Sequence, residues 1–199
     1  MQTESYLKSC FIHKSVMTNE IAKSIDYYPK KTSDKLIGID ATIGGGGHSY
    51  ELLNKFPNLN IIGLDHDPFA RESAINRLKN FESRIEIVSS NFADFRPKNK
   101  VAFIIADLGV NSNQLDDPKR GFSFNKDGPI DMRMNPKLPL SAENLIETLN
   151  EEDLANLIYK YGEERLSRKI SRKIKQDLRE KGKYSGTEAL AYSIAGCFP

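Results

Sequence analysis

Short apolar runs alternate with amphipathic stretches through the first half of the chain. Runs rich in Ile, Leu, Val and Phe predict buried strands at residues 36–40, 60–65, 85–88 and 101–107. Helical spacing predicts helices over 16–28, 48–56 and 68–79, the last with Asp67 as N-cap and Pro68 in its first position. Alternation at this spacing predicts a parallel sheet with helices on both faces.

The pattern changes after residue 107. Residues 108–139 are rich in Gly, Asn, Asp and Pro, which predicts a long loop without regular structure. Helical spacing returns beyond it. We therefore expect the first part of an α/β domain over residues 1–118, followed over 119–199 by this loop's remainder and a helical subdomain.

Two apolar faces predict the helices of that subdomain. One face comprises Leu154, Leu157, Ile158 and Tyr161, and the other comprises Leu166, Ile170, Ile174 and Leu178 at steps of four. A capping residue followed three positions later by an acid predicts a helix start, and the two such pairs are Asn150 with Asp153 and Ser185 with Glu188.

Composition narrows the class of protein. No apolar run in the 199 residues approaches the ~18 of a membrane span, and the N-terminus lacks a signal-peptide core, so we expect a cytoplasmic protein without a membrane partner. Cys10 and Cys197 lie near opposite ends without CxxC spacing, which argues against a disulfide scaffold or a zinc cluster. The three histidines include no HxxxH pair, so we expect no metal.

Charge is unevenly distributed, although the formal net charge is only +2. Residues 160–183 hold ten Lys or Arg against four Asp or Glu. Such a basic stretch is either a solvated helix face or a phosphate-binding surface. If it binds RNA, its candidate residues lie opposite the apolar face of the same helix, and they are Arg165, Arg168, Lys169, Arg172, Lys173 and Lys175.

A run of four glycines, Gly44 to Gly47, follows the first predicted strand and opens a helix at His48. Backbone without side chains lets a ligand approach closely, and a helix N-terminus offers free N–H groups. The run does not fit GxGxxG, because Ser49 occupies the position of the last glycine. A purely structural glycine turn is the alternative.

Three aspartates strengthen the case for a ligand. Asp40, Asp65 and Asp107 each end a predicted parallel strand, and ligands bind at that edge of an open sheet. Asp65 follows Gly44 by 21 residues, the spacing at which an acid meets ribose hydroxyls.

The charge at this edge favours one cofactor. A dinucleotide would place its pyrophosphate near Asp40, where the two would repel, whereas S-adenosyl-L-methionine carries a sulfonium and an ammonium that suit an acid. A P-loop nucleotide would need a lysine, and residues 44–49 contain none. An NAD enzyme stays open as a second reading. Phe92, just past the third strand, is either an adenine platform or a core residue.

Longer motifs resemble a known family. The segments 107–117 (DLGVNSNQLDD), 120–124 (RGFSF) and 128–134 (GPIDMRM) resemble the bacterial small-subunit rRNA (cytosine-N4)-methyltransferase family, called MraW or RsmH. The resemblance begins at 13–16 (HKSV) and includes 40–48 (DATIGGGGH), 63–68 (GLDHDP) and 161–165 (YGEER). Asn111 and Asn113 depart from the Ser and Pro usual there.

The resemblance implies a fold, a cofactor and a partner. The fold would be a Rossmann-like methyltransferase sheet, incomplete here, with an inserted helical subdomain for substrate recognition. The cofactor would be S-adenosyl-L-methionine, and the partner ribosomal RNA in the small subunit. The residues implied to bind the cofactor are Gly46, Gly47, His48, Asp65, Phe92, Asp107 and Gln114. Asp107 would also act in catalysis, as a group that binds the cofactor, accepts a proton from the cytosine N4, or both.

The chain stops at Pro199, inside the expected helical subdomain. Members of the resembled family continue for roughly another hundred residues, so we expect a truncated chain that is unstable or inactive in isolation. Two other functions stay open: a non-catalytic RNA-binding remnant, and a methyltransferase that acts on a small molecule or a protein. The oligomeric state is not predicted.

Overall fold

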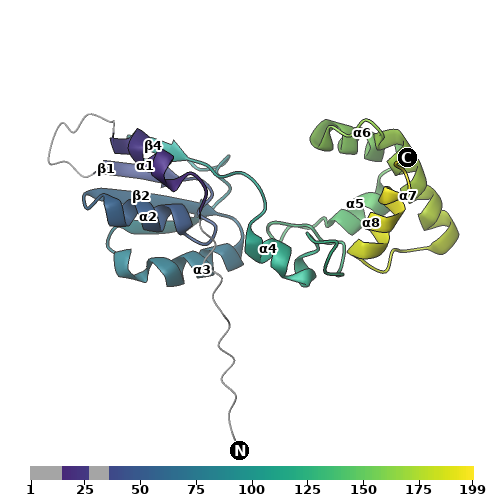
Figure 1. Cartoon of the computed structure of the whole chain (residues 1–199), viewed down its shortest axis with the longest axis horizontal. Coiled ribbons are helices and arrows are strands. Elements are labelled where there is room, and N and C mark those ends of the chain that lie inside the picture. Colours follow the sequence, from purple (N-terminus) through teal and green to yellow (C-terminus); the bar gives the residue numbers. More distant parts are fainter. Residues whose placement is uncertain (1–14, 27–35) are drawn as a thin grey trace, which may run out of the picture. The chain divides into compact units, whose positions relative to one another are not determined.

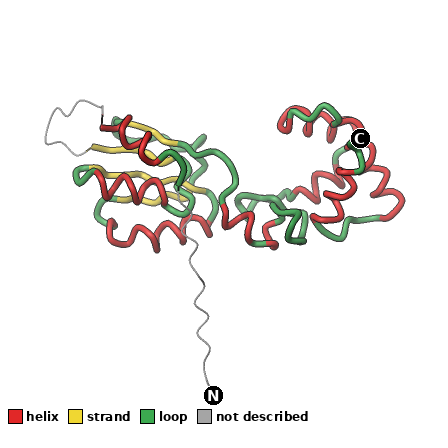
Figure 2. The backbone as a smooth tube through the Cα atoms, viewed as in Figure 1, coloured by secondary structure: helices red, strands yellow, loops and turns green. Residues whose placement is uncertain are grey.

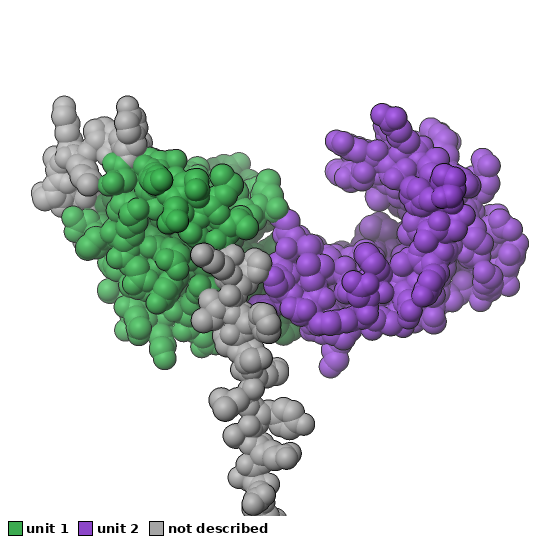
Figure 3. Space-filling view, in the orientation of Figure 1, with its two compact units in different colours: residues 1–108 green, residues 109–199 purple. Residues whose placement is uncertain are grey.

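The computed structural model describes residues 15–26 and 36–199 (Figure 1). Within these residues every strand precedes residue 109, and the rest is helix and loop (Figure 2). The chain forms two compact units, Met1–Leu108 (unit 1) and Gly109–Pro199 (unit 2), coloured in Figure 3. This boundary precedes the expected one at residue 118, because Lys126 binds the backbone and carboxylate of Asp116 and so fastens 109–118 to the loop that follows.

Unit 1 contains a parallel sheet in the order β3-β2-β1-β4. Its strands are β1 (Leu36–Asp40), β2 (Leu59–Asp65), β3 (Ile85–Ser89) and β4 (Phe103–Ile105). Its helices are α1 (Thr18–Asp26), α2 (Gly47–Lys55) and α3 (Pro68–Leu78), with a 3-10 turn at Lys79–Phe81. The predicted α/β pattern is confirmed, and β4 is shorter than the predicted 101–107. The predicted helix over 16–28 extends past Asp26 into residues outside the described part.

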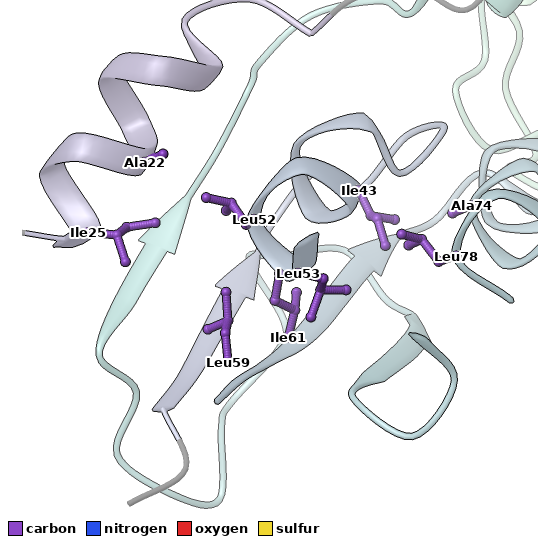
Figure 4. Close-up of a cluster of buried hydrophobic side chains, with 9 residues drawn as sticks. All are labelled: Ala22, Ile25, Ile43, Leu52, Leu53, Leu59, Ile61, Ala74 and Leu78. Carbon is purple, nitrogen blue, oxygen red and sulfur yellow. The ribbon is translucent and has the colours of Figure 1, made fainter. Parts of the chain in front are cut away.

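All three helices of unit 1 pack on one face of the sheet (Figure 4). The residues of this main core that Figure 4 draws are Ala22, Ile25, Ile43, Leu52, Leu53, Leu59, Ile61, Ala74 and Leu78. The other face has a smaller cluster around Ile39 and Leu64, covered in part by Phe95 and Val101. The prediction of helices on both faces is therefore wrong for the described residues. The cause is the connection from β3 to β4, which contains no helix.

Unit 2 is helical. It comprises α4 (Ser112–Asp116), a 3-10 turn at Pro118–Arg120, α5 (Ala142–Thr148), α6 (Glu151–Gly162), α7 (Ser167–Lys181) and α8 (Thr187–Ala195). The predicted face of α7 is confirmed, since Ile170 and Ile174 are buried and Leu166 and Leu178 pack against them. On α6, Tyr161 departs from its predicted face and is 75% exposed, because the helix ends one residue later at Gly162.

The predicted structureless loop is in fact tightly wound. Arg120 is buried and donates to the carbonyls of Arg133 and Met134, at 3.0 and 2.9 Å. A Cβ on Gly128 would lie 1.9 Å from the Pro118 carbonyl oxygen, so no side chain fits there. Residues of the family-like motifs thus hold this loop together. The prediction of no regular structure over 108–139 was wrong, because a polar segment can form short capped helices where its own side chains bind its backbone.

Two predicted helix starts had different outcomes. Asn150 caps α6 as expected, accepting a hydrogen bond from the Asp153 N–H at 2.8 Å. Ser185 does not cap α8; instead the Asp127 carboxylate accepts from the Glu188 N–H at 3.0 Å, across 61 positions. Asp127, which is distant in sequence, therefore takes the capping role that the local pattern assigned to Ser185.

Candidate functional site

The carboxyl ends of β1, β2 and β4 meet at one edge of the unit 1 sheet. Register pairs Asp40 with Gly63 on one side and with Ile105 on the other. The Asp107 N–H donates to the Thr42 Oγ1 at 2.7 Å, across 65 positions, which ties the end of β4 to the turn after β1. The predicted gathering of the three strand ends is confirmed.

The glycine turn contacts the carboxylate of Asp65. The Gly44 N–H donates to the Asp65 Oδ2 at 3.1 Å, and the Asp67 N–H donates to its Oδ1 at 2.9 Å. Each carboxylate oxygen accepts more than one hydrogen bond, so Asp65 keeps acceptor capacity beyond these two. Asp65 is partly exposed and can therefore still reach a ligand.

Asp40 has a different role from the one expected. It is 2% exposed, and its oxygens accept from the Ser49 Oγ at 2.7 Å and from the Thr42 N–H at 3.3 Å. Burial raises the pKa of the Asp40 carboxyl, and the Ser49 hydrogen bond opposes that rise. The expectation that Asp40 meets the positive end of a cofactor is corrected, because its carboxylate is enclosed by the turn after β1 and the start of α2.

Asp107 is the most accessible of the three aspartates. Its residue is exposed, and its carboxylate makes no hydrogen bond or ion pair with the described part of the chain. The three carboxylates thus differ in how far the protein already engages them. Asp40 is enclosed, Asp65 accepts hydrogen bonds from the backbone, and Asp107 is exposed to solvent. The predicted catalytic and cofactor-binding roles of Asp107 stay predictions.

The glycine turn has an open side and a covered side. Gly46 packs against Leu78 of α3, and a Cβ on Gly47 would lie 2.0 Å from the Ser15 Oγ. His48 is 8% exposed, and its Nε2 lies 2.9 Å from the carbonyl oxygen of Val16. The partly exposed residues are instead Gly44, which has a φ of 51°, and Gly45. Gly46, Gly47 and His48 as cofactor-lining residues therefore stay a prediction.

The two remaining predicted cofactor residues lie in different units. Phe92 follows β3 in unit 1 and is 50% exposed, so it is not a core residue. Gln114 belongs to unit 2 and is 3% exposed. There it forms a reciprocal capping box with Asn111, with hydrogen bonds of 2.9 and 3.1 Å. Asn111, one of the two departures from the family motif, serves as an N-cap as a serine would.

Most of the predicted basic face of α7 is paired within unit 2. Lys169 donates to the Cys197 carbonyl at 2.5 Å, and Lys175 donates to the Ile146 carbonyl at 2.5 Å. Arg172 pairs with Glu151 at 3.3 Å, and Lys173 pairs with Asp177 at 2.9 Å.

Arg165 and Arg168 differ from those four. They are exposed and make no hydrogen bond or ion pair among the described residues. They remain the freest cations of the predicted face.

Two hydroxyl groups that sequence reasoning missed hold this edge together. Thr42 joins the turn after β1 to Asp107, and Ser49 satisfies the buried Asp40. Neither residue has a charge or a diagnostic spacing. Ser49 carried a weak signal, since it stands where a GxGxxG motif would have glycine.

The model of the MraW methylase family matches residues 10–199. The chain belongs to the MraW methylase family. Two relatives are each called "Ribosomal RNA small subunit methyltransferase H". The one from Prochlorococcus marinus subsp. pastoris (strain CCMP1986 / NIES-2087 / MED4) is 70% identical, and the one from Prochlorococcus marinus (strain MIT 9301) is 71% identical.

Both alignments cover 100% of this chain and 66% of the relative, so the chain spans slightly less than two thirds of the length of these relatives. Among solved structures, a mycolic acid cyclopropane synthase complexed with SAH and CTAB is 16% identical. That match covers 89% of this chain and 58% of the other, with a TM-score of 0.34. So low a score carries no argument, and the fold assignment depends on the sheet itself.

Residues 15–26 and 36–199 contain no group of three His, Cys, Asp or Glu that could hold a metal ion. No helix among them is long and apolar enough to cross a membrane. Cys197 is a buried free thiol, and Cys10 lies outside the described residues.

Proposed function

We propose that unit 1 binds S-adenosyl-L-methionine and that the family's reaction here is methylation of the exocyclic N4 of a cytosine in small-subunit ribosomal RNA. The names of the relatives support rRNA methylation, and the motif resemblance supports N4 of cytosine. The observation that carries the proposal is the hydrogen bond between Gly44 and Asp65, which places a side-chain-free turn beside a carboxylate at the carboxyl edge of a parallel sheet.

The donor set of this edge fits the cofactor. Asp65 has acceptor capacity for ribose hydroxyls, and Gly44 and Gly45 leave room for close approach. Phe92 offers an exposed aromatic surface for an adenine ring. When bound, the cofactor supplies an electrophilic methyl group on a sulfonium.

The acceptor determines what else the chain must do. The lone pair of the cytosine amine is delocalised into the ring, so the amine is a poor nucleophile and must be held in line by hydrogen-bond acceptors. Asp107 has an accessible carboxylate at the end of β4. We assign it the role of accepting a hydrogen bond from N4 and, as the new bond forms, the N4 proton.

Calorimetry with S-adenosyl-L-methionine tests the cofactor assignment on the 199-residue chain. Asp65→Asn should weaken binding about tenfold, because the charge-assisted hydrogen bond to ribose is lost. Asp94→Asn, a matched change at an exposed residue of the same unit, should leave the affinity unchanged. An affinity that Asp65→Asn does not alter would contradict the assignment. A wild-type chain that does not bind would favour the non-catalytic RNA-binding remnant.

The substrate is tested in a full-length relative, since this chain spans 66% of such a protein. Methyl transfer to unmodified small ribosomal subunits should yield N4-methylcytidine in the nucleoside digest. The counterpart of Asp107→Ala should abolish it while leaving cofactor binding measurable. Transfer to a free small molecule or a protein instead would identify a different substrate on the same fold.

A further inference from the structure

Unit 2 contains a pocket that the proposed function has not used. A cavity of about 470 Å³ lies between the C-terminal half of α7, helix α8 and the connection from Gly182 to Ser185. Figure 1 labels both helices. A volume of this order is typical of pockets that hold small ligands. Lysine, tyrosine and serine side chains are among its lining residues, so it offers charged and hydroxyl groups to a ligand.

Asp177 anchors one wall of the pocket. Its Oδ1 accepts from the Nζ of Lys173 and of Lys181, both at 2.9 Å. Its Oδ2 accepts from the Tyr184 hydroxyl at 3.1 Å and the Ser193 hydroxyl at 2.5 Å. With four donors, the carboxylate is fully engaged, and these hydrogen bonds hold its pKa well below the usual range. Asp177 therefore positions the two ammonium groups and is not itself free to bind a ligand.

The two ammonium groups keep donors to spare. Each ammonium has three N–H donors, and Asp177 accepts one from each. The Asp177 hydrogen bond and the nearby Glu180 carboxylate raise the pKa of Lys173, so its ammonium stays protonated. Lys183 is engaged elsewhere, because its ammonium pairs with Glu147 at 2.9 Å and lies 4.0 Å from Glu143. The remaining donors on Lys173 and Lys181 suit an oxygen-rich anion such as a phosphate.

An exposed aromatic ring lies beside these cations. Tyr192 of α8 lines the pocket and is 72% exposed, so most of its ring surface is available. An aromatic ring next to clustered cations is the combination by which proteins hold single-stranded nucleic acid, with the base stacked and the phosphate neutralised.

We propose that this pocket binds one nucleotide of a single-stranded RNA segment, with its phosphate at Lys173 and Lys181 and its base against the ring of Tyr192. The choice of RNA over other phosphorylated ligands rests on the proposed function. Of the predicted RNA-binding residues, the proposal keeps Lys173 in the middle of α7 and adds Lys181 at its end, and it assigns no main contact to Arg165 and Arg168.

The composition of the chain provides a direct probe. The sequence contains no tryptophan, so Tyr192→Trp gives the 199-residue chain a single tryptophan in the pocket. Titration with an unstructured RNA of about ten nucleotides should quench this tryptophan, because a stacked base lies against it. In the same background, Lys181→Gln should weaken the affinity about tenfold, whereas Arg168→Gln should change it less than about twofold. Lys181 is 69% exposed, which keeps its replacement compatible with folding.

The proposal would be overturned if the RNA did not quench the tryptophan, or if the quenching did not weaken with salt. It would also be overturned if Arg168→Gln lowered the affinity as much as Lys181→Gln. Equal affinity for free cytidine monophosphate and for the RNA would contradict it as well, because the pocket would then be a mononucleotide site. Tyr192→Ala, followed by the anisotropy of labelled RNA, should lower the affinity about tenfold without the new fluorophore. Circular dichroism verifies the fold of each variant. Calorimetry with S-adenosyl-L-methionine on the same samples reports on unit 1, so failure of the cofactor proposal and failure of this one are separate readouts.

Discussion

Each unit buries an aspartate that joins two of its elements, and the two carboxylates are held in opposite ways. Asp40 in unit 1 and Asp177 in unit 2 are each 2% exposed. Asp40 accepts from neutral groups, a serine hydroxyl and a backbone N–H, and its pKa is raised by burial. Asp177 accepts from two lysines and two hydroxyls, and its pKa is lowered. Low exposure alone therefore does not set the direction of a pKa shift: at Asp177 the hydrogen bonds from Ser193 and then from the two lysines outweigh desolvation, whereas at Asp40 desolvation outweighs the Ser49 hydrogen bond.

The two buried carboxylates have different structural roles. In unit 1 the enclosed carboxylate carries an energetic cost and stabilises the turn that presents Gly44 and Asp65. In unit 2 the enclosed carboxylate is part of an ionic network that holds α7 and α8 together, and it leaves cations at the surface. We expect a ligand-binding site next to each of the two buried aspartates, Asp40 and Asp177. The following variants compare how much each aspartate contributes to stability.

The largest expected effect is that of Asp177→Asn. The amide removes the negative charge opposite Lys173 and Lys181 and presents a donor where two hydroxyls now donate. We expect a loss of about 2–4 kcal/mol in the free energy of unfolding, measured by urea denaturation and by hydrogen exchange of α7 and α8. Glu180→Gln, an exposed acid on the same helix, should cost no more than about 0.5 kcal/mol. Equal losses from the two variants would contradict the ionic network.

The pH dependence of that loss should follow the lowered pKa. Because the folded-state pKa of Asp177 lies below the unfolded value of about 3.9, its contribution is complete above that pH and disappears as the pH falls toward the folded-state pKa. The stability difference between the wild type and Asp177→Asn should therefore be constant near neutrality and shrink below about pH 4. Parallel urea titrations from pH 7 to acid measure it, and a difference that grew on acidification would refute the assignment.

The next effect concerns the start of α8. Asp127→Ala removes the carboxylate that accepts from the Glu188 N–H and should cost about 1 kcal/mol of unfolding free energy. Ser185→Ala removes the cap that the local pattern predicts and should change stability by less than about 0.3 kcal/mol. Thermal unfolding of both variants compares the long-range and the local cap. A larger effect at Ser185 would restore the sequence-based prediction.

Of the three aspartate variants, Asp40→Asn should have the smallest effect. An amide can still accept from Thr42 and can donate to Ser49, and it avoids burying a charge. We expect a change within about 1 kcal/mol, in the stabilising direction near neutral pH. The raised pKa means that the wild type regains stability as the pH falls through the folded-state pKa, so the advantage of the variant should fade on acidification. A large destabilisation at neutral pH would show that the ionised form is required.

Local signals predicted much of the fold. The strands, the glycine turn and the caps at Asp67 and Asn150 follow from periodicity and from residues that bind their own neighbours. The same reasoning failed for the second sheet face and for the α8 cap. The helices cover one face because the β3–β4 connection is a loop, and the cap comes from a residue 61 positions away.

The sequence by itself determined the parallel sheet, the family and the edge at which carboxylates gather. Strands and their ends follow from short-range patterns that the chain repeats along its length. Only the tertiary structure decided which polar groups are buried or paired within the protein and which are left accessible. It enclosed Asp40, left Asp107 accessible, paired Lys169 with the Cys197 carbonyl and assembled the Lys173–Lys181–Tyr192 pocket. These outcomes depend on hydrogen bonds and burial, most of them between residues distant in sequence, and a side chain's partners exist only after the chain has packed.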